Sequence, residues 1–288
     1  MSAVFKREFR SYFNNMLGYT VIAGTILLIA VYVYSTNFGD GYPNFEYALQ
    51  SASGFLFTVM IPLLTMKSFA EERRQKTDQL LLTSPLSIGE IVLGKFFGTV
   101  SVIGIAFILC IPYPLIFSIM GHVNFLTAYG ALVGMFFMSC ALCAIGIFIS
   151  SLTENQIVSA IATLCAMLLL SSLGYIISFI PAAAKTNYII LTFFAVAIVI
   201  GIYALTKSFV AAAAFAVVLE GALILVYRLA PRLLERSASK ILSVFSVFGR
   251  MSDFVYGMFD IGTMIYYLSV AALFLFFTVL SVEKRRWS

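Results

Sequence analysis

Two short stretches of the sequence follow patterns that perform chemistry in other proteins, and each lacks an essential part. Residues 89–96, GEIVLGKF, match the phosphate-binding pattern G-x-x-x-x-G-K-[ST] except at Phe96, which replaces the Mg²⁺-binding hydroxyl. Cys140 and Cys143 form a C-x-x-C pair in an apolar stretch, without a second pair or a nearby histidine. The single histidine, His122, excludes a cluster of several histidine ligands. We therefore expect no catalytic residues, no metal site and no cofactor bound by this chain.

One acidic residue, Glu220, lies near the middle of a long apolar stretch, AVVLEGALIL. An ionisable side chain at that depth in a membrane is costly and commonly functional. Glu220 is therefore a candidate for a substrate path or for pairing with a basic group of a partner. A structural acid that faces a polar cavity is the alternative.

A dense run of charged residues, EERRQKTDQLLLTSP, occupies residues 71–85 between two apolar stretches. Its opposite charges recur at a spacing of four, which places each pair on one face of a helix. These pairs are Lys67–Glu71, Glu72–Lys76 and Arg74–Asp78. Pro85 makes continuation of that helix unfavourable, and Ser87 with Glu90 forms the S-x-x-E capping box that starts the next one. The spacing predicts an ordered polar helix, a turn and a second helix.

A second short polar loop, SSLTENQIVSA, repeats this arrangement near residue 153. Thr153 is the expected N-cap, with Gln156 three residues later as its capping-box partner. Glu154 then lies in the first turn, where the helix dipole favours an acid.

The elements that position these residues are helices in a membrane. The chain of 288 residues is 61% hydrophobic and only 11% charged, which leaves too little polar surface for a water-soluble protein. Eight stretches are long and apolar enough to span a bilayer. They are residues 17–38, 51–69, 96–119, 126–151, 157–180, 188–206, 209–229 and 264–282. The region 188–229 is interrupted at Thr206–Ser208, and its length suits two spans joined by a tight turn there. We therefore expect an all-α, polytopic membrane helix bundle of eight spans, with six as the alternative.

The distribution of basic residues orients this bundle. With both termini inside, the inner loops hold 12 Lys and Arg and the outer loops hold 6. Residues 1–16 predict an amphipathic helix on the inner membrane surface, and residues 230–262 predict an interfacial or re-entrant segment on the outer side. Gly94-xxx-Gly98 permits a close helix contact, for which packing within the chain is the favoured interpretation.

The blocks FKREFRSYFNNMLGY, SFAEERRQKTDQLLLTSPLSIGEIVLGKF, SSLTENQIVSA and FDIGTMIYYLSVAALFLFFTVLSVEKRRW occur in this order. In these blocks the sequence resembles the ABC-2 family of ABC transporter permeases, and most closely its gliding-motility and NosY-type members. The resemblance covers nearly the whole chain and implies one transmembrane domain over residues 1–288. That family has six spans per subunit, paired into a dimer, so the extra region at 188–229 departs from it.

The resemblance also implies a function and a site. The family's permeases are energised by a separate ATP-binding subunit that contacts a cytosolic coupling-helix loop, here residues 67–95. By resemblance this contact is formed by Glu71, Glu72, Arg73, Arg74, Gln75, Lys76 and Asp78, with Thr153, Glu154, Asn155 and Gln156 as a smaller second contact. The implied partners are two ATP-binding subunits that carry ATP and Mg²⁺, a second permease copy or paralogue, the lipid bilayer and, in some relatives, an auxiliary membrane-anchored subunit.

The expectation is therefore a non-enzymatic permease subunit of an ABC exporter in the bacterial cytoplasmic membrane, with no nucleic acid as a partner. Two alternatives stay open. An ion-coupled secondary transporter needs ionisable groups within the bundle, and Glu220 is the one mid-span acid. A membrane enzyme needs a convergent set of catalytic side chains, which the sequence does not display. The substrate is not identified by the sequence, nor is the choice between a homodimer and a heterodimer.

Overall fold

The computed structural model describes residues 1–38, 44–77, 86–120, 123–207, 209–229, 231–257 and 260–286. The elements in these ranges are helical, which confirms the predicted all-α fold. The chain divides into two compact units. The bundle unit comprises Met1–Ser171 and Val247–Ser288, and the hairpin unit comprises Ser172–Ser246.

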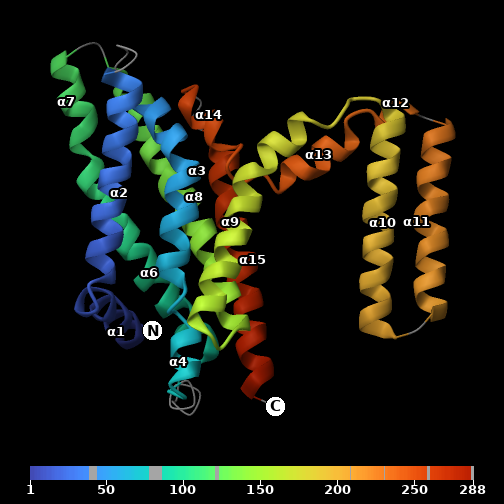
Figure 1. The fold of residues 1–288 in the computed structure, drawn as a ribbon, viewed down its shortest axis with the longest axis horizontal. Helices are drawn as coiled ribbons and strands as arrows, with labels where there is room; N and C mark the ends of the chain where they lie inside the picture. Colours follow the sequence, from blue (N-terminus) through green and yellow to red (C-terminus); the bar gives the residue numbers. More distant parts are fainter. Residues whose placement is uncertain are drawn as a thin grey trace. The chain divides into compact units, whose positions relative to one another are not determined.

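The bundle unit contains nine α-helices and a short π-helix in its described residues, together with the first part of α9. They are α1 (Ser2–Asn14), α2 (Leu17–Val33), η1 (Tyr34–Phe38), α3 (Phe45–Thr65), α4 (Ala70–Arg74), α6 (Ile88–Cys110), α7 (Pro112–Met120), α8 (Phe125–Leu152), α9 (Gln156–Ser178), α14 (Met251–Val255) and α15 (Ile261–Arg286). Figure 1 shows α2, α3, α6, α8 and α15 running along one another, and it places the N and C labels at the end that carries α4. We call this end the terminal face.

Six helices of the described residues are long and apolar enough to cross a membrane, as expected for a polytopic bundle. They cover Leu17–Asn37, Phe45–Arg74, Ile88–Ile119, Phe125–Leu152, Gln156–Ser178 and Ile261–Arg285. The two further spans of the eight-span prediction correspond to the helices α10 (Ala184–Thr206) and α11 (Phe209–Leu229). In α10, the described apolar segment is Ala184–Ala197, which is shorter than a span, so the count of eight stays a prediction.

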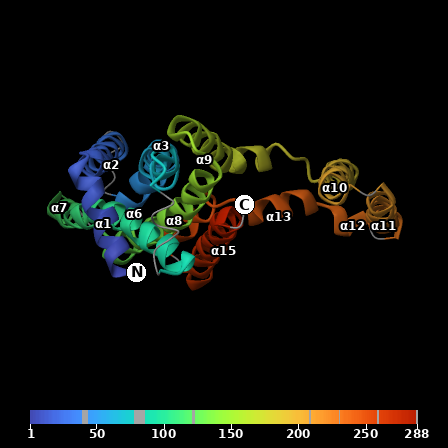
Figure 2. The ribbon, with the colours of Figure 1, turned by 90° about the horizontal axis from the view of Figure 1, so that it is seen from below.

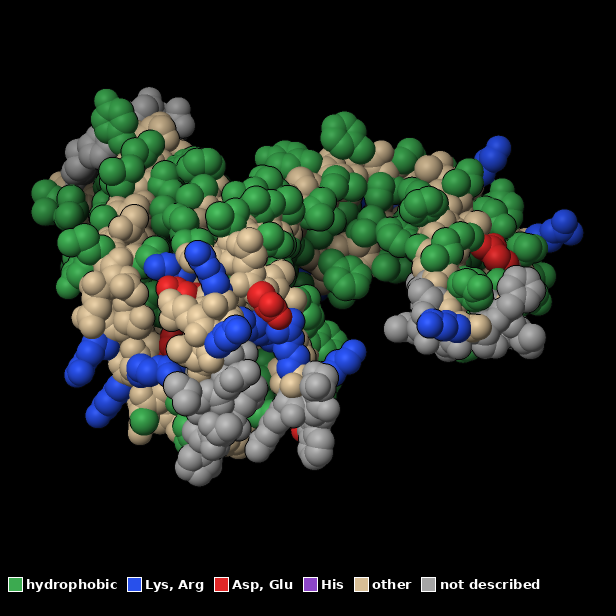
Figure 3. Space-filling model, turned by 60° about the horizontal axis from the view of Figure 1, so that its bottom comes forward, with side chains coloured by type: hydrophobic (Ala, Val, Ile, Leu, Met, Phe, Trp, Pro, Cys, Tyr) green, Lys and Arg blue, Asp and Glu red, His purple; other side chains and the backbone are tan. Residues whose placement is uncertain are grey.

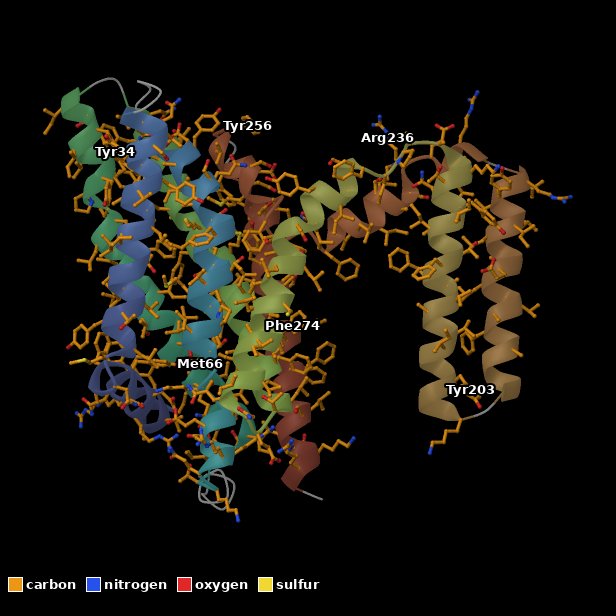
Figure 4. The ribbon with its side chains drawn as sticks, viewed as in Figure 1. Tyr34, Met66, Tyr203, Arg236, Tyr256 and Phe274 are labelled. Atoms are coloured by element: carbon orange, nitrogen blue, oxygen red, sulfur yellow. The ribbon has the colours of Figure 1, made fainter. Side chains whose placement is uncertain are left out.

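Helix α8 forms the centre of the bundle unit. It packs against α3, α6, α14 and α15, and Figure 2 shows it between α6 and α15 in the view from below. Small residues on α8 permit these close contacts, because a Cβ atom on Gly146 would lie 2.9 Å from Thr65 Cβ, and one on Gly134 would overlap the Phe254 ring. The ring of Phe148 lies near that of Phe274 of α15, which Figure 4 labels; the ring centroids are 5.7 Å apart and the rings are tilted by 57°.

Backbone breaks occur where the sequence predicts them, and also at one unexpected residue. Helix α6 ends at Cys110 and α7 begins at Pro112, because proline lacks the N–H that a continuous helix needs. Ser87 caps α6, and both bonds of the capping box with Glu90 are present, which confirms that prediction. Met16 adopts the left-handed conformation with φ 58°, so that the chain turns sharply from α1 into α2.

The hairpin unit contains α10, α11, α12 (Pro231–Leu234) and α13 (Ser237–Val244). Helices α10 and α11 lie side by side, with the rings of Tyr188 and Tyr227 stacked at 5.0 Å between centroids. The buried Asn187 side chain donates to the carbonyls of Pro181 and Ala183 and accepts the Ala238 N–H at 3.1 Å, which fastens α13 to α10. Over residues 237–255 the expected amphipathic region forms two short helices, α13 and α14.

Candidate functional site

The amphipathic helix α1 lies directly on α6, at two glycines of the latter. A Cβ atom on Gly94 would lie 2.9 Å from Val4, and one on Gly98 would lie 2.9 Å from Glu8. The Gly94-xxx-Gly98 spacing therefore receives α1 of the same chain, as the favoured interpretation of intrachain packing predicts. This close approach brings the carboxylate of Glu8 to the residue between the two glycines, Lys95.

Lys95 is the centre of the site, although its side chain is only 1% exposed. Its ammonium group donates to Glu8 Oε1 at 2.8 Å and to the Ser68 carbonyl oxygen at 2.7 Å. Glu72 Oε2 lies 2.9 Å away as an ion pair without hydrogen-bond alignment. Three oxygens thus surround a group with three N–H bonds, and the Phe69 ring covers it at 5.0 Å from the centroid. Lys95 therefore joins α1, the segment 67–77 and α6.

A second cation, Arg7, completes the cluster at its solvent side. Its Nη2 lies 2.6 Å from Glu72 Oε1 and 2.9 Å from Glu8 Oε1, while its side chain is 51% exposed. Burial alone raises the pKa of Glu8, but the charge and hydrogen bonds of Lys95 and Arg7 outweigh burial and hold this pKa below its ordinary value. Glu8 is therefore a carboxylate at neutral pH, and the four charges balance.

Tyr12 extends this contact one turn further along α1. Its hydroxyl donates to the Leu64 carbonyl oxygen at 3.1 Å and shares a hydrogen bond of 3.0 Å with Thr99. Burial raises the pKa of Tyr12, so it stays a neutral phenol. Helix α1 is thus bonded to the end of α3 as well as to α6.

Helix α4 is held by the end of α8. The N–H groups of Phe69 and Ala70 donate to Ser150 Oγ at 3.1 and 3.2 Å, so a side chain of α8 satisfies the first donors of α4. Arg73, which is 8% exposed, donates to the Thr153 carbonyl oxygen at 3.4 Å. The structure therefore brings together the two segments that the resemblance names as contacts, at Arg73 and Thr153.

The predicted helical pairing of Glu72 with Lys76 is wrong. Helix α4 ends at Arg74, and Lys76 adopts the left-handed conformation with φ 57°. Glu72 turns toward Arg7 and Lys95, because a buried ion pair with two cations is less screened than a surface pair. The pair Lys67–Glu71 is present at 3.9 Å, and Asp78 lies outside the described residues.

Within the segment 67–77 the predicted contact residues differ in exposure. Arg74, Gln75 and Lys76 are exposed, whereas Glu71 is half-buried and accepts a hydrogen bond of 3.3 Å from Gln75 Nε2. A cavity of about 450 Å³ separates this segment from α1, and Lys95 and Tyr12 line it. Solvent and partners can therefore reach the edge of the charge cluster.

The predicted capping by Thr153 is also wrong. Thr153 ends α8, and its Oγ1 is buried without a hydrogen-bond partner in the described part of the chain. Asn155 takes the capping role instead, since its Oδ1 accepts the Ile157 N–H at 2.9 Å. Glu154 is 71% exposed and pairs with Arg285 of α15 at 3.0 Å. Gln156 begins α9.

Glu220 lies in α11 of the hairpin unit. Thr192 Oγ1 of α10 donates to Glu220 Oε2 at 3.5 Å. Its Oε1 is buried and has no hydrogen-bond partner among the described residues. Glu220 thus joins the two helices of the hairpin.

The other sequence motifs are structural in the described residues. Residues 89–96 form the first turns of α6, where Lys95 faces carboxylates. Cys140 and Cys143 are buried in α8 as free thiols. No group of three His, Cys, Asp or Glu residues that could hold a metal occurs in the described ranges.

Comparison with known proteins identifies the family. The family model described as ABC-2 family transporter protein matches residues 26–187, more than half of the chain. The matched region contains Glu72, Lys95 and the loop 153–156, whereas Glu8 precedes it. Among curated proteins, none matches the chain. The chain therefore belongs to the ABC-2 transporter family, as a multi-pass membrane permease.

Proposed function

We propose that this chain is the permease subunit of an ABC exporter in the bacterial cytoplasmic membrane, with the terminal face toward the cytoplasm. Members of the ABC-2 family generally work with an ABC ATP-binding subunit. Two such subunits, which carry ATP and Mg²⁺, would drive a pair of permeases, either two copies or a copy and a paralogue. The order of the sequence blocks favours the gliding-motility and NosY-type subgroup, in which an auxiliary membrane-anchored subunit is a further candidate partner.

The observation that carries this proposal is the buried Lys95 cluster. Arg74, Gln75 and Lys76 are exposed for a partner to contact, and Glu72 of the same segment is bound to Lys95. A displacement of the segment by the ATP-binding subunit would pass through Lys95 into α6 and through Glu8 into α1. It would pass through Ser150 and Thr153 into α8, the centre of the bundle.

Transport of this kind needs no reactive group in the permease itself. The closure of two ATP-binding subunits supplies the work, and the bundle changes between packed arrangements. Charged contacts suit a surface that must stay bound to a partner while it moves. They tolerate small displacements better than closely interdigitated apolar side chains do. The transported substrate is left open.

Site-directed photo-crosslinking tests the docking of the partner. We replace Gln75 with cysteine in a Cys165→Ser background, attach a benzophenone and irradiate gently extracted membranes of the native host. The Gln75→Cys protein is expected to capture a chain that binds ATP. Tyr256→Cys is the matched control, since Tyr256 is 69% exposed at the opposite end of the bundle unit (Figure 4).

The proposal is wrong if no ATP-binding chain is captured through Gln75→Cys and none co-purifies with the unmodified protein. Capture through Tyr256→Cys alone would contradict the assigned orientation. The second candidate function, an ion-coupled transporter, is favoured by Glu220, whose Oε1 lacks a partner in the described residues. It predicts that Glu220→Gln abolishes function in the host while capture of any ATPase is absent.

A further inference from the structure

The segment 67–77 contains both acids and bases, and the acids Glu71 and Glu72 make contacts within the chain. Glu72 is 16% exposed and faces Lys95 and Arg7. Glu71 is 31% exposed and takes contacts from Lys67 and Gln75. On α1, Glu8 is 12% exposed and is bound to Lys95. The acids of both elements are thus occupied by bonds within the chain.

Other bases of the same two elements are exposed to solvent. Arg74 and Lys76 of the segment and Lys6 and Arg10 of α1 are exposed. Within the described ranges, none of these four has an ion-pair partner. Figure 3, which brings the terminal face forward, shows blue side chains spread over it and fewer red ones. On these two elements the surface open to a partner is therefore mainly basic, although the sequence of the segment also contains acids.

The two basic elements form one surface. The cavity of about 450 Å³ lies between them and is lined by Arg7 and Ser11 from α1 and by Gln75 and Thr77 from the segment. Lys95 fixes their spacing, because it binds Glu8 on one side and Glu72 on the other. A partner that touches Lys76 therefore meets a pre-arranged array of positive charge.

A protein fits this surface better than a lipid headgroup does. Helix α3 alone has 21 residues, which at about 1.5 Å each covers about 32 Å, close to a hydrocarbon core of about 30 Å, and α4 follows beyond its end. Figure 1 shows α4 extending past the level of α1. Helix α1 carries the stacked rings of Phe5 and Phe9, typical of a helix at the membrane surface, so Arg74 and Lys76 lie further out in water.

We infer that the ATP-binding subunit meets this basic surface with an acidic docking patch. The inference depends on the proposed function and adds the chemistry of the partner's contact. Long-range attraction between such patches accelerates association and fixes orientation, and it weakens as salt is added. The carboxylates Glu8 and Glu72 do not cancel the surface charge, because Lys95 and Arg7 already neutralise them.

The test uses the ATP-binding chain that co-purifies with the unmodified permease. Arg74→Glu with Lys76→Glu is compared with the charge-retaining pair Arg74→Lys with Lys76→Arg. At about 50 mM salt the reversed pair is expected to weaken association of the ATP-binding chain at least ~10-fold, and the retained pair less than ~2-fold. At about 500 mM salt the difference should shrink, because the screening length falls to a few ångströms.

A carbodiimide crosslink identifies the opposing group. The reagent joins a lysine amine to a nearby carboxylate as an amide, so Lys76 should be recovered in a peptide linked to an Asp or Glu of the ATP-binding chain. Lys76→Arg should remove that link and keep binding, because a guanidinium does not react. Binding of the same variants to phosphatidylglycerol and phosphatidylcholine vesicles is measured in parallel.

The outcomes separate this inference from the proposed function. If no ATP-binding chain associates with the unmodified protein, the proposed function fails and the inference fails with it. If the chain associates but charge reversal and salt leave its affinity unchanged, only the acidic patch is refuted. If charge reversal abolishes binding to phosphatidylglycerol vesicles and leaves the ATP-binding chain bound, the basic surface serves lipid instead.

Discussion

Removal of the Lys95 charge is the most direct perturbation of the site. In Lys95→Met the side chain keeps its length and apolar stem but loses the ammonium group that contacts Glu8, Glu72 and the Ser68 carbonyl. Breaking a buried ion pair by removing one partner costs about 3–5 kcal/mol, because the remaining charge is left uncompensated. Arg7 still contacts both carboxylates from the solvent side, so we expect the lower end of this range.

A loss of about 3 kcal/mol should be visible as a fall in the unfolding midpoint. For a chain of this size each kcal/mol corresponds to about 2–4 °C, which gives a fall of about 6–12 °C. The midpoint is measured in one detergent by fluorescence-detected size exclusion after heating. Lys67→Met is the matched control, since its pair with Glu71 is 3.9 Å long and partly exposed and should contribute less than about 1 kcal/mol.

The cause is tested by removing the charges that Lys95 neutralises. Glu8→Gln with Glu72→Gln in the Lys95→Met background should recover part of the lost stability, because no buried carboxylate then lacks a partner. If Lys95→Met unfolds within about 2 °C of Lys67→Met, the buried ammonium does not stabilise the contact of α1 with the segment. The structural interpretation of the cluster would then be refuted.

Three further perturbations address the neighbouring contacts. Gly98→Ala should lower stability or displace α1, because the new methyl group would lie 2.9 Å from Glu8. Gly89→Ala on the same helix is the control, since its methyl group enters open space and should have no effect. Limited proteolysis near the N-terminus distinguishes the two variants. Because the pKa of Glu8 is lowered, its carboxylate stabilises the fold fully at neutral pH, and this stabilisation is lost as the pH falls below the ordinary pKa of about 4.5. The unfolding midpoint of the unmodified protein should therefore fall more steeply in acid than that of Glu8→Gln. Equal slopes for the two proteins would contradict the assigned role of Glu8. Ser150→Ala leaves two N–H groups at the start of α4 without their acceptor, which should lower the free energy of unfolding by about 1–3 kcal/mol. Hydrogen exchange at residues 69–70 should become faster, and unchanged exchange would contradict the assigned cap.

Local patterns of the sequence predicted the elements of the fold well. The apolar stretches became helices, and Ser87 with Glu90 formed the expected capping box. These features depend on neighbours within a few residues, where spacing translates directly into geometry. The Thr153 cap failed because Asn155, two residues later, offers an equally good acceptor and only the folded backbone decides between them.

The centre of the site was not predicted, because its bonds are long-range. Lys95 and Glu8 are 87 positions apart, and no local pattern relates them. The helical spacing of four favoured a pair of Glu72 with Lys76, but in the structure Glu72 pairs with the buried Lys95 instead. The sequence does contain one signal of this contact. Lys95 lies between Gly94 and Gly98 at the start of an apolar helix, and two glycines at this spacing indicate that another helix packs closely there. The resemblance names Arg73 as a contact residue, but Arg73 is 8% exposed, so charge reversal there would be a poor test of docking.

The buried Lys95 has a consequence for how the chain enters the membrane during synthesis. Its two carboxylate partners, Glu8 and Glu72, both precede it in the sequence, so they leave the ribosome first. A lysine at the start of an apolar span is costly to insert without a counter-charge, and in the folded chain Glu8 and Glu72 supply two. Both counter-charges of Lys95 are therefore synthesised before the third span that carries it.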